Sequence, residues 1–190
     1  YENKKVLVTG HTGFKGTWLT AWLLKLGATV IGISKDIPTN PSMFEKLKFE
    51  NKIKHYQEDI RNLSRMTQII LDEKPDFLFH LAAQAIVSTS YGDPINTISS
   101  NVMGTANILE SLKKTNYKCT AIIITSDKTY GNVEQVWGYK ENDKMGGKDI
   151  YSGSKGAAEL IIKSYYHSFF KSSECNIKLA IGRAGNVIGG

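Results

Sequence analysis

The sequence predicts an α/β fold, in which helices cover both faces of a doubly wound parallel sheet. Short apolar runs rich in β-branched residues alternate along the chain with segments of helical apolar spacing. The runs lack the apolar–polar alternation of half-exposed strands, which indicates strands that are buried on both faces. Strands that alternate with helices are typical of parallel sheets joined by right-handed crossovers. We therefore expect ligands to bind beyond the carboxyl ends of the strands.

Three strands and two helices are predicted in the first third of the chain. The run at 4–10 is a short apolar strand that ends in a glycine-rich turn, and 16–27 has helical spacing closed by a glycine suited to a C-cap. The β-branched run at 28–34 is a second strand. A short helix is expected at 41–50, after a proline-containing loop, and a third strand at 52–60.

The rest of the chain repeats this alternation. The segment 63–75 is predicted to be a helix that its terminal proline stops, and the helix 95–115 begins directly after a proline. We expect a fourth strand at 76–83 and a fifth strand at 119–124. A further helix is predicted at 152–170, followed by a sixth strand with its exit loop at 177–187.

The composition is that of one ordinary globular domain. The chain has 190 residues, of which 41% are hydrophobic and 22% charged. Its net charge of +6 comes from dispersed lysines, which favours a solvated surface over a nucleic-acid patch and would also suit an anionic substrate. No apolar run approaches the roughly 20 residues that span a bilayer, so we expect a cytoplasmic protein. Cys119 and Cys175 have no neighbours at ligand spacing, so we expect reduced thiols and no metal site.

The turn after the first strand carries three glycines in the pattern GHTGFKG at 10–16. Glycines at such a turn let the backbone approach a pyrophosphate, which the amides at the helix N-terminus then bind. A glycine triplet is often only a turn, but the strand–turn–helix context favours a dinucleotide site. The predicted cofactor contacts in this turn are Gly10, Thr12, Gly13, Phe14, Lys15 and Gly16.

The end of the second strand leaves the choice between NAD and NADP open. An NAD-binding chain usually carries an acidic residue there for the ribose 2′-hydroxyl. This sequence has Ser34 and Lys35 at that position, with Asp36 two places late. A lysine can accommodate a 2′-phosphate. We expect NAD, keep NADP as the alternative, and predict cofactor contacts for Ser34 and Lys35.

Tyr151 and Lys155 stand four residues apart at the start of a predicted helix. Residues at this spacing lie on one helix face, so a phenol and an ammonium can point into one cleft. The ammonium and a cationic nicotinamide would lower the phenol pKa from about 10, allowing Tyr151 to take a proton from a substrate hydroxyl. The same pair also arises by chance on helix surfaces, but here it follows a nucleotide-binding pattern.

These motifs resemble the extended short-chain dehydrogenase/reductase family, and the resemblance covers almost the whole chain. It implies a Rossmann domain. Asp59-Ile60 resembles the adenine-contacting pair of that family, and the segment HLAAQ at 80–84 resembles its strand end on the nicotinamide side. Asn101 matches its structural asparagine. The further cofactor-contacting candidates that the resemblance implies are Asp59, Ile60, Leu81, Ala82, Ala83, Asn101, Thr125, Tyr151 and Lys155.

The segment TSDKTYG at 125–131 resembles one branch of that family, the nucleotide-sugar 4,6-dehydratases, which carry an aspartate and a second ionisable residue there. Oxidation of a hexose needs only a hydroxyl near Tyr151, which Ser126 supplies. A ketone at C4 makes the C5 proton acidic, so water can then be eliminated. We predict Asp127 as the acid, with its pKa raised by burial, and Lys128 as the base, with its pKa lowered. A salt bridge between the two is the alternative.

Lys128 narrows the resemblance to the dehydratases that act on CDP-glucose, because many others have glutamate at this position. The segments at 138–160 and 182–190 agree with this branch. The resemblance implies a CDP-hexose substrate, a CDP-4-keto-6-deoxyglucose product, and substrate contacts from Gln84 and Asn186. Another dehydratase or 4-epimerase acting on UDP- or GDP-sugars, or a non-catalytic dinucleotide-binding protein, remains open.

The resemblance also concerns the parts of the protein outside this sequence. Family members form the sugar-nucleotide pocket with a C-terminal substrate-binding domain, which has no counterpart in this chain. We therefore expect residues 1–190 to be the dinucleotide-binding domain of a longer protein. Family members often pair through helices, so we also expect a homodimer or homotetramer, with no nucleic-acid or membrane partner.

Overall fold

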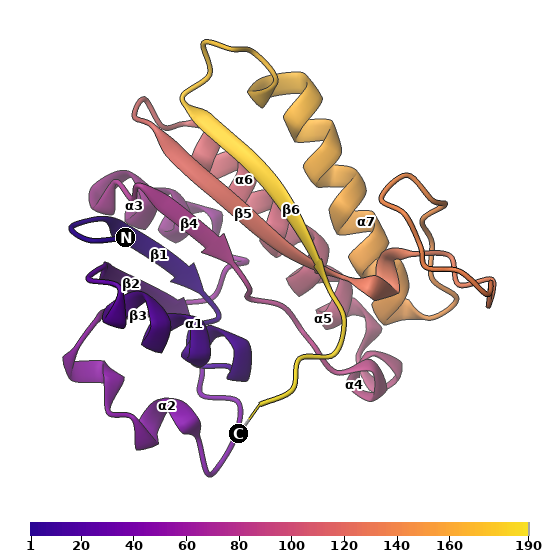
Figure 1. The fold of residues 1–190 in the computed structure, drawn as a ribbon, viewed down its shortest axis with the longest axis horizontal. Coiled ribbons are helices and arrows are strands. Elements are labelled where there is room, and N and C mark those ends of the chain that lie inside the picture. The colour runs from indigo at the N-terminus through magenta and orange to yellow at the C-terminus, as the bar shows by residue number, and fades with distance from the viewer. Residues whose placement is uncertain (190) are drawn as a thin grey trace.

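A six-stranded, wholly parallel sheet forms the centre of the computed structural model, which describes residues 1–189 (Figure 1). The strand order is β3-β2-β1-β4-β5-β6. This order reverses direction between β1 and β4, as in a doubly wound sheet, so the predicted α/β fold is confirmed. The strands are β1 (Lys5–Thr9), β2 (Thr29–Ser34), β3 (Lys54–Gln57), β4 (Phe77–His80), β5 (Cys119–Ser126) and β6 (Ile177–Ala184).

Helices pack on both faces of this sheet (Figure 1). One core joins Leu7 and Ile31 to apolar side chains of α3, α6 and α7, and a second core joins Val6 and Val8 to Leu23 of α1. Because successive side chains of a strand point to opposite faces, both faces of β1 are buried. The helices are α1 (Phe14–Lys25), α2 (Met43–Lys46), α3 (Leu63–Glu73), α4 (Val87–Gly92), α5 (Pro94–Ile98), α6 (Gly104–Lys113) and α7 (Ile150–Tyr165).

Three predicted segments differ from the structure. The helix expected at 41–50 is divided into α2 and a 3₁₀ turn at Phe49–Asn51, because Lys48 between them has a left-handed φ of 51°. The third strand is shorter than expected and ends at Gln57, before the turn that carries Asp59. The helix expected at 95–115 is realised as α5 and α6, joined by a wide π turn at Ser99–Met103.

The short helix α4 was not predicted, because its sequence VSTSYG has no apolar periodicity. It lies in the connection between β4 and α5, beside the sheet edge where the strands end (Figure 1). Within residues 1–189, no helix combines the length and apolar character needed to cross a membrane.

Candidate active site

A cleft of about 810 Å³ opens beyond the carboxyl ends of the strands. All the site residues predicted from the sequence line it, with the single exception of Asn101. The turn after β1, the end of β2, the segment after β4, the end of β5 and the start of α7 contribute to its walls. The parallel sheet thus gathers motifs that are far apart in the sequence at one edge.

The glycine turn after β1 has no room for a side chain at Gly10 or Gly16. Gly10 has a φ of 74°, and a Cβ atom there would lie 2.8 Å from the main-chain nitrogen of Ala82. A Cβ atom on Gly16 would lie 2.1 Å from the carbonyl oxygen of Gly10. The N-cap of α1, Gly13, provides no side-chain cap, and the first turn of the helix has no acidic residue. The amides in the first turn of α1 therefore receive no acceptor from the N-cap side chain, which fits a dinucleotide pyrophosphate.

The part of the cleft beside the end of β2 combines a hydroxyl with exposed charges. Ser34 is buried, and its oxygen accepts a hydrogen bond from the Thr12 main-chain nitrogen at 3.4 Å. Lys35 and Asp36 form an exposed ion pair of 3.5 Å. Asp36 also lines the cleft, although it stands two places after the position where an acidic residue was expected.

Asp59 lines the cleft, but its carboxylate is already bound to a neighbour. The Arg61 side chain donates hydrogen bonds to both Asp59 oxygens at 3.0 Å. The hydrogen bonds from Arg61 lower the pKa of Asp59. Sequence reasoning did not single out Arg61, although it stands directly after the predicted Asp59-Ile60 pair.

His11 is a second residue that sequence reasoning did not assign. Its ring is fully buried, with Nδ1 3.1 Å from the Ser34 oxygen and Nε2 2.7 Å from Nδ1 of His55. Burial, and then the proximity of His55, lower the pKa of His11 to about 4, so the ring is neutral at pH 7. Only its position between two turn glycines could have drawn attention to it.

Asn101 lies behind the wall of the cleft. Its side-chain oxygen accepts a hydrogen bond from the Gln84 main-chain nitrogen at 2.8 Å, and its nitrogen donates to the Gln84 carbonyl at 3.1 Å. The nitrogen also donates to the hydroxyl of Ser154 on α7 at 2.9 Å. Asn101 therefore ties the segment after β4 to α7, and its position favours a supporting role over the predicted cofactor contact.

A buried chain of hydrogen bonds fixes the turn after β4. The Thr105 hydroxyl donates to the Asn101 carbonyl at 2.7 Å, so its oxygen can accept only a donor, Nε2–H of His80 at 3.1 Å. Nδ1 of His80 then accepts from the Thr9 hydroxyl at 2.7 Å. The Thr9 oxygen in turn accepts from the main-chain nitrogens of residues 81–82, both at 3.2 Å. Burial, and then Lys155, lower the pKa of His80 to about 3.

Tyr151 and Lys155 lie on one face of α7, as predicted. The Lys155 nitrogen is 5.9 Å from the centre of the Tyr151 ring, and both residues are buried. Asp149 caps the helix by accepting a hydrogen bond from the Ser152 main-chain nitrogen at 2.9 Å, which sets the position of its first turn. Burial, and then the nearby Lys15, lower the pKa of Lys155 to about 8.

The pKa of Tyr151 moves in the opposite direction to our expectation. Burial raises it, Asp127 and Asp149 raise it further, and only a hydrogen bond with Ser126 lowers it. Lys155 is not among the causes of the shift, so the predicted lowering by its ammonium does not occur in the chain alone. Any lowering of the phenol pKa must come from a cation that binds in the cleft.

Asp127 and Lys128 follow β5 in a single 3₁₀ turn, and their side chains are exposed. This exposure differs from the burial that the sequence analysis expected for Asp127. The two side chains form no ion pair with each other in the described part of the chain, which removes the alternative of a salt bridge. The Ser126 hydroxyl donates to the Asp127 carboxylate at 2.9 Å.

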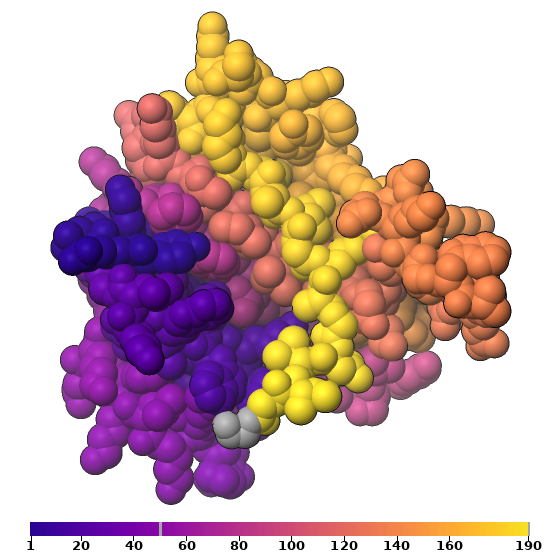
Figure 2. Space-filling view, in the orientation of Figure 1, coloured from indigo at the N-terminus to yellow at the C-terminus, as the bar shows by residue number. Residues whose placement is uncertain are grey.

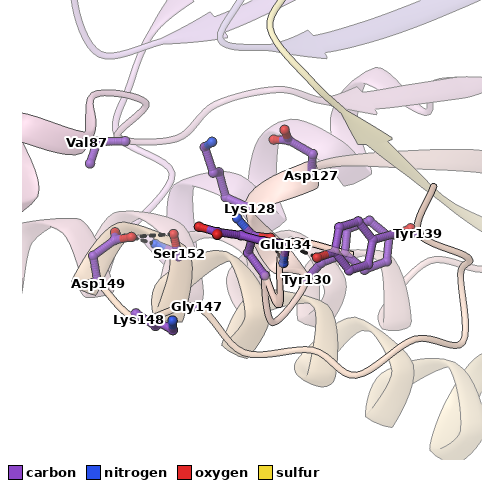
Figure 3. A pocket seen from close by; sticks show the side chains of 11 residues that line it. Val87, Asp127, Lys128, Tyr130, Glu134, Tyr139, Gly147, Lys148, Asp149 and Ser152 are labelled. Atoms are coloured by element: carbon purple, nitrogen blue, oxygen red, sulfur yellow. Dashed lines mark hydrogen bonds between the residues drawn. The ribbon is translucent and has the colours of Figure 1, made fainter. Parts of the chain in front are cut away.

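A second pocket, of about 760 Å³, shares Asp127, Lys128 and Val87 with the cleft (Figure 3). Its other wall includes Tyr130 and Tyr139, whose rings stack with centres 5.0 Å apart. In Figure 3 the side chains of Asp127 and Lys128 extend away from these stacked rings. The acid and the base thus stand on the boundary between two cavities.

Known proteins share both the sequence and the fold of this chain. A family model described as GDP-mannose 4,6 dehydratase matches residues 7–180. The chain is 47% identical over its whole length to the CDP-glucose 4,6-dehydratase of Salmonella typhimurium, covering 54% of that protein. It is 30% identical, over 87% of its length, to the CDP-paratose 2-epimerase of Salmonella typhi, again covering 54% of the relative.

A solved structure agrees with these relatives. The crystal structure of UDP-glucuronic acid 4-epimerase from Bacillus cereus, in complex with UDP-glucuronic acid and NAD, matches with a TM-score of 0.78 and 29% identity. The match covers 94% of this chain and 55% of the epimerase. The chain thus spans about half the length of the relatives that it matches. These matches, together with the strand order and the glycine turn after β1, show that the chain belongs to the GDP-mannose 4,6-dehydratase family, within the extended short-chain dehydrogenase/reductases.

Proposed function

We propose that the protein is a nucleotide-sugar 4,6-dehydratase that converts CDP-glucose to CDP-4-keto-6-deoxyglucose. The observation that carries this proposal is the unpaired acid and base, Asp127 and Lys128, beside the buried pair of Tyr151 and Lys155 on the same cleft. A redox reaction alone needs only the second pair. The identity of 47% to a CDP-glucose 4,6-dehydratase supports the choice of substrate.

The cofactor in this proposal is NAD. The glycine turn after β1 and the amides at the start of α1 would hold the pyrophosphate, and Ser34 and Lys35 would face the adenosine ribose. A bound nicotinamide would supply the chemistry of taking the C4 hydride and returning it at C6. NADP is the alternative, because Lys35 lies where a 2′-phosphate would be placed. Titration of the protein with both cofactors decides between them, and a strong preference for NADP would reverse the assignment.

In the first half of the reaction, Tyr151 acts as a phenolate and takes the proton of the C4 hydroxyl. Burial raises the pKa of Tyr151, and Lys155 is not among the causes of this shift, so the phenolate needs a further cation bound in the cleft. The pKa of about 8 keeps Lys155 mainly protonated at pH 7. A hydrogen bond with the Ser126 hydroxyl lowers the pKa of Tyr151. The sugar leaves this half-reaction as a C4 ketone.

In the second half, Lys128 removes the C5 proton, which the ketone has made acidic, and Asp127 protonates the C6 hydroxyl so that it leaves as water. The C5–H and C6–O bonds break, and the electron pair of the former closes the C5–C6 double bond. Reduction at C6 and protonation at C5 complete the product. The sugar loses one water, C4 is oxidised, C6 is reduced, and there is no net change of redox state.

The proposal is tested with the full-length protein and three substrates in parallel, namely CDP-, UDP- and GDP-hexoses. We expect loss of one water from CDP-glucose, detected by mass spectrometry. Inversion at C4 without loss of water would identify an epimerase. Cofactor binding with no change in any sugar would identify a non-catalytic dinucleotide-binding protein. Either result would overturn the proposed dehydratase.

We also propose that the longer protein works in the cytoplasm as a homodimer or homotetramer. Ile95 of α5, Met103 of the π turn and Leu160 of α7 expose more than half of their surface, which suits a helix-to-helix contact between subunits. Light scattering coupled to size-exclusion chromatography measures the mass in solution. A monomer at all concentrations would contradict this part of the proposal.

A further inference from the structure

A buried ion pair links α7 to β6. Glu159 lies one helical turn beyond Lys155 and is 1% exposed, and Arg183 on β6 has a side chain that is 11% exposed. Nε of Arg183 donates to both Glu159 oxygens, at 3.0 and 2.9 Å, and Nη2 donates to one of them. This fork matches the geometry in which arginine binds a carboxylate most strongly.

The pair also contacts the end of β5. The Thr125 hydroxyl donates to Glu159 at 3.2 Å, and Thr125 stands directly before Ser126. On the other side, the Arg183 guanidinium lies 4.5 Å from the centre of the Tyr130 ring, which itself stacks on Tyr139. A cation at this distance from a ring face is attracted to it, more strongly when water is excluded. The turn that carries Asp127 and Lys128 is thus held at both of its ends.

The same arginine reaches the long loop that follows. Residues 131–149 form no helix or regular strand, and they stand out from one side of the molecule (Figure 2). Main-chain hydrogen bonds from Gly131 to Lys144, at 2.8 Å, and from Gly146 to Thr129, at 2.9 Å, close the base of this loop. Nη2 of Arg183 contacts the Met145 sulfur at 3.6 Å, beside these bonds.

One nitrogen of the guanidinium does not contribute to this network. Nη1 of Arg183 is buried and has no hydrogen-bond partner among the described residues. A buried donor without an acceptor reduces stability. The guanidinium thus contacts both the Tyr130 ring and Glu159 in a position that leaves one of its own donors unsatisfied.

We propose that Glu159 and Arg183 are positioning residues, which hold the turn of Asp127 and Lys128 through Tyr130 and so serve the elimination of water. This inference rests on the proposed function. Tyr151 and Lys155 do not depend on the ring contact, because α7 and its Asp149 cap fix them. Loss of the pair should therefore impair water elimination while the oxidation at C4 continues.

The experiment compares variants of the full-length protein with CDP-glucose. In R183K the charge opposite Glu159 remains, but the planar fork and its stacking on Tyr130 are lost. We expect water loss to fall by about tenfold to 100-fold, since a misplacement of about 1 Å has this effect. The C4 ketone, trapped by reduction with borodeuteride, should form at a rate within about twofold of the wild type. Y130L should behave like R183K, and Y130F, which keeps the ring, like the wild type.

Lys163 provides the matched control. Its nitrogen lies 3.4 Å from the same Glu159 carboxylate and 3.7 Å from the Met145 sulfur, but among the described residues Arg183, and not Lys163, is the cation over the Tyr130 ring. K163M should leave both half-reactions unchanged. If R183K slows oxidation and elimination equally, or if K163M has the same effect as R183K, the pair only stabilises the fold and the inference is wrong.

A readout without turnover separates this inference from the proposed function. Hydrogen–deuterium exchange of the amides at 127–131 and 144–146 should be faster in R183K and Y130L, with unchanged exchange in the first turns of α7. Unchanged exchange at 127–131 would overturn the positioning role, whatever the enzyme does. If the wild type loses water from no sugar nucleotide but R183K still loosens this turn, the dehydratase assignment fails and the positioning of the turn stands.

Discussion

The Lys155 ammonium lies 5.9 Å from the centre of the Tyr151 ring, and both side chains are buried at the wall of the cleft. Its pKa of about 8 is below the ordinary value of 10.5 because the charged form is costly to bury. Since this pKa is lower in the folded chain, the unfolded chain binds more protons between pH 8 and 10.5. The stability contributed by this group must therefore rise with pH in that window.

The variant K155M tests this relation. The free energy of unfolding of the wild type should rise relative to that of K155M by up to about 1.4 kcal/mol per pH unit between pH 8 and 10.5. Urea titrations at several pH values measure both proteins. A difference that does not depend on pH would show that Lys155 is solvated in the folded chain.

Acid should weaken the fold through buried histidines. The pKa of His11 is lowered from 6.5 to about 4, mainly by burial. Between these pH values the unfolded chain therefore binds more protons at His11 than the folded chain does. Stability is present above pH 6.5 and is lost as the pH falls toward 4. H11Q should lack the destabilisation that comes from His11, so its free energy of unfolding should change less steeply with pH, by up to about 1.4 kcal/mol per pH unit. Urea titrations at several pH values between 4 and 6.5 measure this slope.

A matched substitution checks the acid result. His167 is exposed, so H167Q should reproduce the wild-type slope. Equal slopes in H11Q and the wild type would mean that His11 accepts a proton in the folded chain. The pKa of His80 is lowered to about 3 by burial and then by Lys155, so His80 also reduces the stability of the fold in acid, and H11Q does not remove this second contribution.

Two glycines of the same turn should respond differently to alanine. In G16A the new Cβ would lie 2.1 Å from the Gly10 oxygen and 2.6 Å from Cα of His11, both main-chain atoms that must move. We expect a loss of about 1–3 kcal/mol in the free energy of unfolding. In G13A the nearest atom is 3.4 Å away, so stability should change little. Thermal unfolding compares them, and equal losses would contradict the close packing of α1 on the turn.

Replacement of Asp127 by asparagine should separate binding from elimination. The carboxylate is exposed and forms no ion pair among the described residues, so D127N should fold and bind cofactor like the wild type. Loss of an acid–base group typically reduces a rate by about 100-fold to 10,000-fold, and we expect water loss to fall in that range. Mass spectrometry of the sugar nucleotide measures it. Water loss at the wild-type rate would refute the role of Asp127.

The sequence predicted the fold well wherever apolar residues formed local patterns. The runs of β1, β2 and β5 are short and rich in β-branched residues, so burial on both faces was expected from composition alone. The helix α4 was missed because its polar residues carry no period. The break at Lys48 in the segment 41–50 was missed because a left-handed lysine has no local signature.

The candidate site was predictable where a motif has a fixed spacing. The glycine turn and the Tyr151–Lys155 pair line one cleft because the ends of parallel strands meet at one sheet edge. Partnerships between distant residues were not readable. Glu159 and Arg183 are on different elements, and the exposure of Asp127 depends on how the chain leaves β5. The buried state of Ser34 beside His11 is equally a product of tertiary packing.

The boundary that Asp127 and Lys128 form between the two cavities has a consequence for engineering. A designer who replaces Asp127, Lys128 or Val87 to reshape one pocket for a new sugar also changes the lining of the other pocket, because all three residues belong to both. Libraries that vary Tyr139 reshape the second pocket while they leave these shared residues and the contact of Tyr130 with Arg183 in place.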